Sequence, residues 1–264
     1  MAAPSYAVAI SGTFDAPSIL FAVLTAPDEM AFKRLLGRHV PLRHVKGLKA
    51  LRAHQAATLE TAWAEVAQRW PGAAASPPYW AVAWPGGRAL ARQLLQEPEE
   101  IRGLRVLEIG CGGAVAAIAA AQSGAAEVTA VDIDPLACLA ARANAAANGV
   151  SLKVLQVDML AGSGDQRWDL ILAADLWYER FFAHRVSSWL HERAADGCRV
   201  LLADLGRAFL PRKGLLELAR MDLIDSLGTE QGSDLCVRIC QVMPPTLQDL
   251  RVSAESTVAH QACV

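Results

Sequence analysis

The chain has 264 residues, a formal net charge of −2 and 53% hydrophobic residues. This balance lacks the basic excess of a general nucleic-acid-binding protein, and no apolar run approaches the roughly 20 residues that span a bilayer. No basic residue precedes Lys33, so the first segment has neither the charged start of a secretory signal nor the arginines of a mitochondrial presequence. We therefore expect a cytoplasmic protein that binds neither nucleic acid nor membrane, and we expect a monomer.

The six cysteines include no C-x-x-C pair, and the six histidines show no spacing typical of a metal site. In a chain of this size such cysteines indicate reduced, mostly buried thiols. We expect no metal centre.

Chain composition predicts three regions. Residues 1–78 form an amino-terminal extension, in which a basic stretch precedes an amphipathic helix over 51–70, and Pro71-Gly72 and Ser76-Pro77-Pro78 end that helix. The basic stretch fits either a solvated face or a surface for an acidic protein. Residues 79–243 form the main domain, and 244–264 a flexible tail.

Within the main domain, strand and helix patterns alternate, which implies a mostly parallel sheet covered on both faces. A helix is predicted over 88–95 before the first strand. The predicted strands are 105–109, 127–132, 152–156, 169–174, 198–204, 221–227 and 235–242, and the helices between them 114–123, 135–148, 180–194 and 211–220. The last two strands lack an intervening helix and are separated by turn residues, so we expect an antiparallel hairpin.

A glycine loop follows the first of these strands. Gly110 and Gly112 lie between strand 105–109 and the next helix, where the backbone can approach a ligand closely. The dinucleotide fingerprint G-x-G-x-x-G requires a glycine at position 115, but Val115 stands there. The loop therefore favours a ligand other than a pyrophosphate, and a nicotinamide oxidoreductase is the weakest interpretation.

Acidic residues at successive strand ends complete this predicted site. Glu108 would repel a pyrophosphate but can bind the ammonium group of a zwitterion, directly or through water. Asp132 follows Gly112 by twenty residues, the spacing of a carboxylate that binds ribose hydroxyls, whereas Asp134 before Pro135 is typical of a helix N-cap. Asp158 is placed to reach an adenine amino group. Together these residues predict a site for S-adenosylmethionine, which carries no phosphate.

Three further stretches, Trp80-Ala-Val-Ala-Trp-Pro-Gly-Gly87, Asp175-Leu-Trp-Tyr178 and Gly206-Arg-Ala-Phe-Leu-Pro211, accompany this loop. With them the chain resembles the seven-strand, S-adenosylmethionine-dependent protein lysine methyltransferases, and within these the group that modifies the β-subunit of electron transfer flavoprotein. The resemblance covers roughly residues 40–242. It implies a Rossmann-like seven-strand α/β sheet, mostly parallel with a carboxyl-terminal antiparallel hairpin, plus a helical amino-terminal extension. Many loops of the family read Gly-x-Gly-x-Gly, and Ala114 replaces the third glycine, which is tolerated if its φ is negative.

The resemblance also implies roles at the acceptor end. Asp175 and Tyr178 are the expected catalytic residues, with Asp175 orienting a lysine amine and Tyr178 bounding its channel, and Trp177 is an expected substrate-binding residue. Trp80 and Trp84 are expected to cover the cofactor. Arg207 fits either a substrate groove or the plain surface.

The expected activity is protein-lysine N-methylation, with electron transfer flavoprotein β-subunit as the expected partner. A ribosomal protein or a small-molecule amine is an alternative acceptor. A catalytically silent S-adenosylmethionine-binding module is an alternative of a different class.

Overall fold

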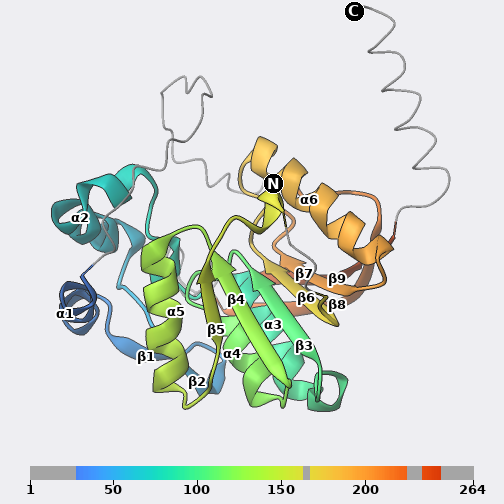
Figure 1. The fold of residues 1–264 in the computed structure, drawn as a ribbon, viewed down its shortest axis with the longest axis horizontal. Coiled ribbons are helices and arrows are strands. Elements are labelled where there is room, and N and C mark those ends of the chain that lie inside the picture. Colours follow the sequence, from blue (N-terminus) through green and yellow to red (C-terminus); the bar gives the residue numbers. More distant parts are fainter. Residues whose placement is uncertain (1–27, 163–166, 225–233, 245–264) are drawn as a thin grey trace, which may run out of the picture.

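The computed structural model describes residues 28–162, 167–224 and 234–244, and its centre is a seven-stranded sheet (Figure 1). From residue 245 onward the predicted tail lies outside the described residues. The strand order is β5-β4-β3-β6-β7-β9-β8. The strands are β3 (Arg105–Ile109), β4 (Glu127–Asp132), β5 (Lys153–Gln156), β6 (Leu170–Ala174), β7 (Arg199–Asp204), β8 (Leu215–Ile224) and β9 (Asp234–Val242).

Strands β3 to β7 run parallel, and β9 pairs antiparallel with both β7 and β8. The predicted fold class is therefore confirmed, including the antiparallel pair at the end. Because the chain builds outward from β3 through β4 to β5 and then returns to the other side of β3 with β6, strand order reverses between β3 and β6. The ligand crevice of an open α/β sheet lies at the carboxyl ends of such strands.

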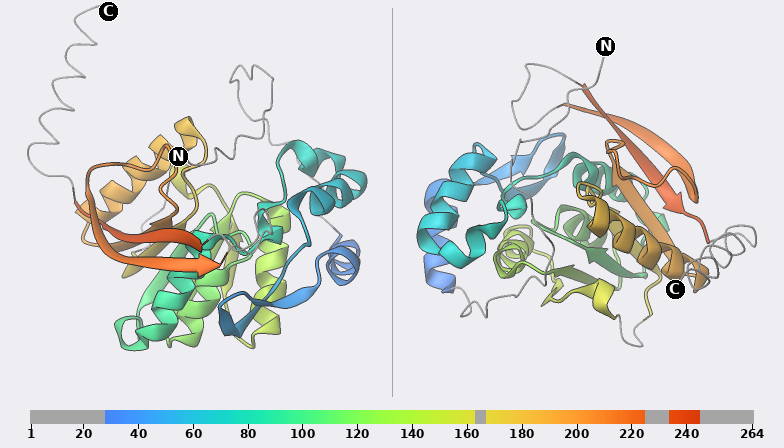
Figure 2. Two further views of the ribbon diagram at one scale, coloured as in Figure 1. Left: turned by 180° about the vertical axis from the view of Figure 1, so that it is seen from behind. Right: turned by 90° about the horizontal axis from the view of Figure 1, so that it is seen from above.

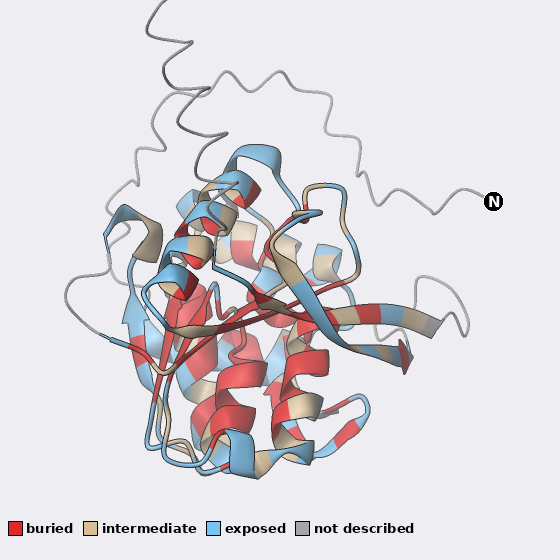
Figure 3. Cartoon of the chain, turned by 90° about the vertical axis from the view of Figure 1, so that its right-hand side faces the viewer, coloured by how far each residue is buried: buried red, intermediate tan, exposed pale blue. Residues whose placement is uncertain are grey.

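Helices cover both faces of the sheet (Figure 2). On one face α3 and α4 pack against side chains such as Val106 and Leu172, and on the other α6 packs against Leu107 and Ile171. The alternation of neighbouring residues between the two cores is the period of two that a strand imposes. Figure 3 shows the buried residues gathered in the sheet and in the helices against it. The helices are α3 (Pro85–Gln96), α4 (Val115–Gln122), α5 (Pro135–Ala147) and α6 (Arg180–Ala195).

The predicted helix over 211–220 is wrong, because β8 begins at Leu215. Its Leu-, Glu- and Ala-rich sequence has good helix propensity. Pairing with β9 along Leu215–Ile224 overrides this local preference, and β8 becomes the edge strand of the sheet.

The amino-terminal region contains helices α1 (Glu29–His39) and α2 (Leu59–Arg69), and a hairpin that the sequence did not predict, β1 (Leu42–Val45) with β2 (Leu48–His54). The helix that was predicted to begin at Leu51 begins eight residues later in the structure, at Leu59, with Thr58 as its N-cap. Helices α1 and α2 share a buried cluster with Trp80 and α5, and β2 also contacts α5. None of the described helices is long and apolar enough to cross a membrane.

Arg88 on α3 ties the hairpin to the far edge of the sheet. Its side chain is 1% exposed, and its guanidinium donates to the carbonyl oxygens of Lys46, in the β1–β2 turn, and Ile224, at the end of β8, at 3.0 to 3.2 Å. One buried guanidinium thus provides hydrogen bonds to backbone carbonyl oxygens of two chain segments that are far apart in sequence.

Arg88→Met is expected to lower the free energy of unfolding by about 3 kcal/mol, because both carbonyls lose charge-assisted hydrogen bonds. Urea denaturation measures the loss. Arg92→Met, on the exposed side of the same helix, is the matched control and should change stability by less than about 0.5 kcal/mol. Equal stability of the Arg88 and Arg92 variants would contradict the anchoring role.

Candidate cofactor and acceptor site

The glycine loop lies between β3 and α4, at the point where strand order reverses. Gly110 and Gly112 have φ values of 58° and 50°, a left-handed conformation that glycine adopts at little cost. A Cβ added to Gly110 would lie 2.6 Å from Cδ2 of Leu176, which follows β6. The loop after β3 and the segment after β6 therefore approach each other closely.

Ala114 departs from the expectation for it. Its φ is 58° and its ψ 36°, so the condition that its φ be negative is not met. The residue is fully buried and its amide donates to the Cys111 carbonyl at 2.7 Å, which closes the turn into α4. Left-handed backbone costs a residue with a Cβ about 1–2 kcal/mol, so the loop holds local strain.

Asn144 on α5 fastens this loop, and the sequence analysis missed it. Its side chain is fully buried; Nδ2 donates to the Gly113 carbonyl at 2.9 Å, and Oδ1 accepts from the His54 backbone amide at 2.8 Å. Asn144 therefore links the amino-terminal hairpin to the glycine loop. The available signal was a polar residue within the alanine-rich stretch from Pro135 to Ala147.

Glu108 points beneath the loop. It is 3% exposed, and its Oε2 accepts a hydrogen bond from the Ala117 amide in the first turn of α4 at 2.8 Å. Burial raises its pKa to about 8, and the negative charge of Asp132 contributes. In this structure Glu108 supports the helix that follows the loop, and its binding of a ligand ammonium stays a prediction.

Asp132 ends β4 beside the loop, as predicted. Its carboxylate accepts from the amides of Gly112 at 2.9 Å and Asp134 at 3.0 Å, and burial raises its pKa. Asp134 is the N-cap of α5, accepting from the Leu136 amide at 2.8 Å, as its place before Pro135 indicated.

Asp158, after β5, has both oxygens engaged. One caps the short helix Met159–Ala161 through the Leu160 amide at 2.9 Å, and the other pairs with Arg185 of α6 at 3.2 Å. Contact with an adenine amino group stays a prediction, and it would have to accommodate the ion pair.

The chemistry of this edge fits a cationic, phosphate-free ligand. The hydrogen-bond partners of Asp132 described above are backbone amides rather than basic side chains, so its buried carboxylate would repel a pyrophosphate and attract an ammonium or a sulfonium. Glu108, with a pKa of about 8, is mostly protonated at neutral pH and contributes a polar group rather than a full charge. Beside them, Ile133 and Val157 expose 44% and 37% of their surface, although both are apolar. They offer a wall for an aromatic base. S-adenosylmethionine carries an ammonium, a sulfonium and an adenine base, and it has no phosphate.

Asp175, directly after β6, is held in place from three sides. Its backbone is left-handed, with a φ of 59°, and its amide donates to the Ala203 carbonyl at 3.1 Å. Its carboxylate accepts from the Gly87 amide at 3.1 Å and contacts the Arg207 guanidinium at 2.7 Å. A Cβ on Gly86 would lie 2.6 Å from Asp175 Oδ2, so the glycine there is needed for this approach.

Four aromatic side chains form a cluster that includes Tyr178, three residues after Asp175. Tyr178 is 51% exposed, and its ring centroid lies 5.6 Å from that of Tyr79 and 5.8 Å from that of Phe182. Trp84 packs edge-on against Tyr79 at 5.8 Å and donates from Nε1 to the Tyr79 carbonyl. Sequence analysis singled out Tyr178 and Trp84 but missed Tyr79 and Phe182. Burial raises the pKa of Tyr178 to about 12, with smaller contributions from Tyr79 and Asp132.

Two tryptophan predictions require correction. Trp177 is fully buried under α6, where its Nε1 donates to Ser187 Oγ at 3.0 Å, so it does not line a substrate channel. Trp80 is 2% exposed and its ring packs against Phe32 of α1 in the amino-terminal core. Its backbone rather than its ring borders the glycine loop, since a Cβ on Gly113 would lie 3.1 Å from the Trp80 carbonyl oxygen.

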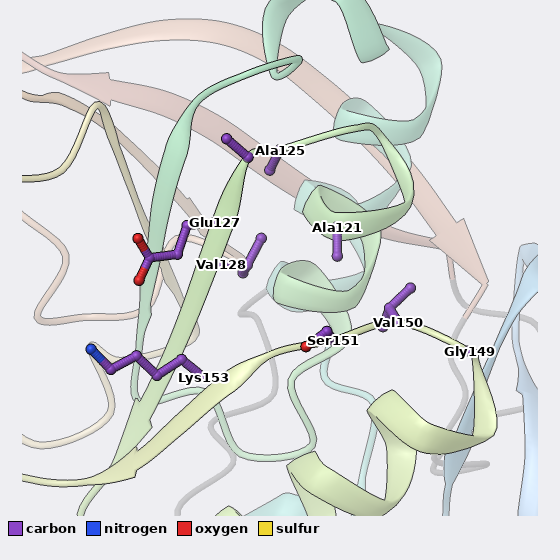
Figure 4. Close-up of a pocket in the computed structure, with 9 residues that line it drawn as sticks. Ala121, Ala125, Glu127, Val128, Gly149, Val150, Ser151 and Lys153 are labelled. Carbon is purple, nitrogen blue, oxygen red and sulfur yellow. The ribbon is translucent and has the colours of Figure 1, made fainter.

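A hollow at the other end of the sheet is separate from this site (Figure 4). It lies by Glu127 and Lys153, the first residues of β4 and β5, and small residues at the end of α4 border it. Ligand crevices of open α/β sheets form at the carboxyl ends of strands, and this hollow lies at the amino ends.

The strand order, the glycine loop and the buried Asp132 at the end of β4 together define the class of seven-stranded, S-adenosylmethionine-dependent methyltransferases. The family model for ribosomal protein L11 methyltransferase (PrmA) matches residues 89–176, the segment that carries the loop and Asp175. A solved structure of ribosomal protein L11 methylase from Lactobacillus delbrueckii subsp. bulgaricus has 21% identity and a TM-score of 0.43, and the match covers 60% of this chain and 79% of that one.

Two curated relatives are more similar. The electron transfer flavoprotein beta subunit lysine methyltransferase of Danio rerio is 41% identical over 173 residues, which are 64% of this chain and 66% of the relative. That of Xenopus laevis is 39% identical over 173 residues, 64% of this chain and 69% of the relative. The chain thus spans about two thirds of the length of these relatives. It belongs to the electron transfer flavoprotein beta subunit lysine methyltransferase family.

Ala114→Gly is expected to raise the free energy of unfolding by about 1 kcal/mol, because glycine removes the strain of a left-handed alanine. Ala116→Gly, inside α4, should instead lower it by about 1 kcal/mol. Urea denaturation of both variants checks the opposite signs. A loss of stability in both would contradict the strain at Ala114.

Glu108→Gln is expected to be more stable than the wild type at pH 8 and similar to it near pH 5. The folded pKa of about 8 exceeds the ordinary glutamate pKa of 4.5, so folding takes up a proton between these values. The stability contributed by the protonated carboxyl is present below pH 4.5 and lost as the pH rises to 8, whereas glutamine stays neutral throughout.

Unfolding free energies at pH 5, 6, 7 and 8 should therefore show the variant gaining roughly 3 kcal/mol over the wild type across this range. Glu127→Gln, at the exposed start of β4, is the control and should follow the wild type. Parallel curves for the wild type and Glu108→Gln would show that Glu108 titrates in the ordinary range.

Proposed function

We propose that this protein is an S-adenosylmethionine-dependent protein-lysine N-methyltransferase whose acceptor is the β-subunit of electron transfer flavoprotein. The observation that carries the proposal is the close meeting of two segments at the reversal of strand order. The loop of Gly110 and Gly112 would hold the cofactor, and Leu176, which follows Asp175 and precedes Tyr178 by two residues, approaches Gly110 closely. Family membership supports the acceptor, since the relatives are named for that substrate.

The cofactor side is assigned to the loop and its acids. Glu108 and Asp132 would face the ammonium and ribose groups, and Ile133 with Val157 would contact the adenine ring. When bound, S-adenosylmethionine supplies the methyl group on a sulfonium that an amine can attack in line. Asn144 keeps the Gly113 segment in place, so the site is preorganised before a ligand arrives.

The acceptor side must receive a lysine without its proton. A free lysine has a pKa of about 10.4 and is protonated at neutral pH. The rings of Tyr79, Trp84, Tyr178 and Phe182 form a largely apolar mouth, which disfavours an ammonium and favours the neutral amine. Because the pKa of Tyr178 is about 12, its hydroxyl stays protonated and can donate a hydrogen bond, so Tyr178 is a wall and a donor rather than a base.

Asp175 is assigned to orient the amine. Its carboxylate, held by Gly87 and Arg207, keeps free lone pairs that can accept a hydrogen bond from the nitrogen and balance the positive charge formed on transfer. A catalytically silent S-adenosylmethionine-binding module would need no carboxylate that can accept a hydrogen bond from an acceptor amine.

A ribosomal protein acceptor is the second candidate, favoured by the match of residues 89–176 to the ribosomal protein L11 methyltransferase model. That segment contains the cofactor loop and ends before Tyr178, so it carries little of the acceptor side. Incubation with labelled S-adenosylmethionine and, separately, purified electron transfer flavoprotein and ribosomal protein L11, followed by mass spectrometry, distinguishes the two. Labelling of ribosomal protein L11 alone would overturn the proposed acceptor.

Asp175→Asn is expected to lower the rate of lysine methylation by about 100-fold or more, because the amine loses its charged partner. Binding of S-adenosylmethionine, measured by isothermal titration calorimetry, should be nearly unchanged. Asp169→Asn, in an exposed ion pair with Arg105 at the opposite end of β6, is the control and should keep full activity. Full activity of Asp175→Asn would refute the assigned role.

A further inference from the structure

Arg207 stands at the centre of a buried charge cluster that sequence analysis could not distinguish from the plain surface. One of its nitrogens, Nη1, lies 2.7 Å from Asp175 Oδ1 and 2.6 Å from Asp204 Oδ2. The Asp204 side chain is fully buried, that of Asp175 is 8% exposed and that of Arg207 23%. A single guanidinium group therefore joins the carboxylates that follow or end the neighbouring strands β6 and β7.

Asp204 fixes the position of Arg207. Its Oδ1 accepts hydrogen bonds from the backbone amides of Gly206 and Arg207, both at 2.7 Å, and so shapes the turn that leaves β7. Gly206 has a φ of 84°, which this turn requires. Both backbone and side chain of Arg207 are thus tied to one buried aspartate, which leaves the guanidinium little freedom at Asp175.

We propose that Arg207 is a positioning residue, which holds the Asp175 carboxylate in the orientation that receives the acceptor amine and limits the negative charge around that amine. This inference rests on the proposed methyl transfer to lysine. Arg207 itself acts through Asp175 and is assigned no contact with the reacting atoms.

The charge balance explains why the arginine matters. Asp175, Asp204 and Arg207 together carry a net charge of −1 when all are ionised. Without the guanidinium, two buried carboxylates would face each other with a net charge of −2, which is costly in a poorly solvated place. The excess negative charge would also raise the pKa of an incoming ammonium and hold its proton, opposing the neutral amine that transfer needs.

Burial raises the pKa of Asp175, the charge and hydrogen bond of Arg207 lower it, and the charge of Asp204 raises it. Burial also raises the pKa of the Cys240 thiol on β9, with a smaller contribution from Asp204. Removing the arginine therefore shifts the titration of Asp175 upward.

A first test needs no methylation activity. In Arg207→Met the folded pKa of Asp175 rises further above its unfolded value, so folding takes up more protons and stability increases as the pH falls. The melting temperature of Arg207→Met should rise more steeply from pH 8 to pH 5 than that of the wild type. Adding Asp175→Asn should remove much of this extra dependence. Identical pH dependence in wild type and Arg207→Met would overturn the charge role.

The second test measures catalysis with S-adenosylmethionine and electron transfer flavoprotein. Arg207→Met should lower kcat about 100-fold, move the acid limb of the kcat/KM profile upward by about one pH unit, and leave the Kd for S-adenosylmethionine within about threefold. Arg207→Lys should restore part of the rate and the original acid limb. Arg212→Met, five residues after Arg207 and exposed, is the control.

Unchanged kcat and pH profile in Arg207→Met would overturn the proposal, as would a loss of activity matched by an equal loss of cofactor affinity. If the wild type methylates no protein, the proposed function fails, while the pH dependence of stability still decides whether Arg207 controls the charge of Asp175.

Discussion

The reversal of strand order between β3 and β6 is the constraint on which the rest of the site depends. Strands β4 and β5 lie on one side of β3, and β6 and β7 lie on the other. The connections that follow β3 and β6 therefore run in opposite directions, and a crevice forms between them at the carboxyl ends of these strands. The contact that a Cβ on Gly110 would make with Leu176 shows how closely the two segments approach. Residues about 65 positions apart in sequence are thereby brought together.

Electrostatics then gives this crevice its selectivity. On the β3 and β4 side, the buried carboxylate of Asp132 has backbone amides rather than a basic side chain as its hydrogen-bond partners, which suits a cationic ligand. On the β6 and β7 side, two aspartates share one arginine, which balances one of their two negative charges. The difference matches the two needs of methyl transfer, since the methyl donor is cationic and the acceptor must arrive neutral.

The amino-terminal region contributes to the site by packing rather than by chemistry. Trp80 brings its backbone against the glycine loop because its ring is buried with Phe32 of α1, and Asn144 carries a hydrogen-bond connection from His54 of β2 to Gly113. Arg88 fixes the turn of the same hairpin. The segments that precede the sheet therefore hold the loop from outside and reduce the ordering that ligand binding would otherwise require.

The sequence by itself determined the alternation of strands and helices from 105 to 204, the glycine loop, and the acids Asp132 and Asp134, because these depend on local periodicity, caps and fixed spacings. It also placed Asp175 and Tyr178 at a strand end. Only the tertiary structure decided what those side chains contact. Leu215–Ile224 became a strand through pairing with β9, Trp177 moved into the core under α6, Ala114 took a left-handed backbone to close its turn, and Arg207 reached Asp175 across two strands. Apart from the Ala114 turn, which Cys111 closes locally, these outcomes depend on partners in other elements of the fold, and no local pattern records such partners.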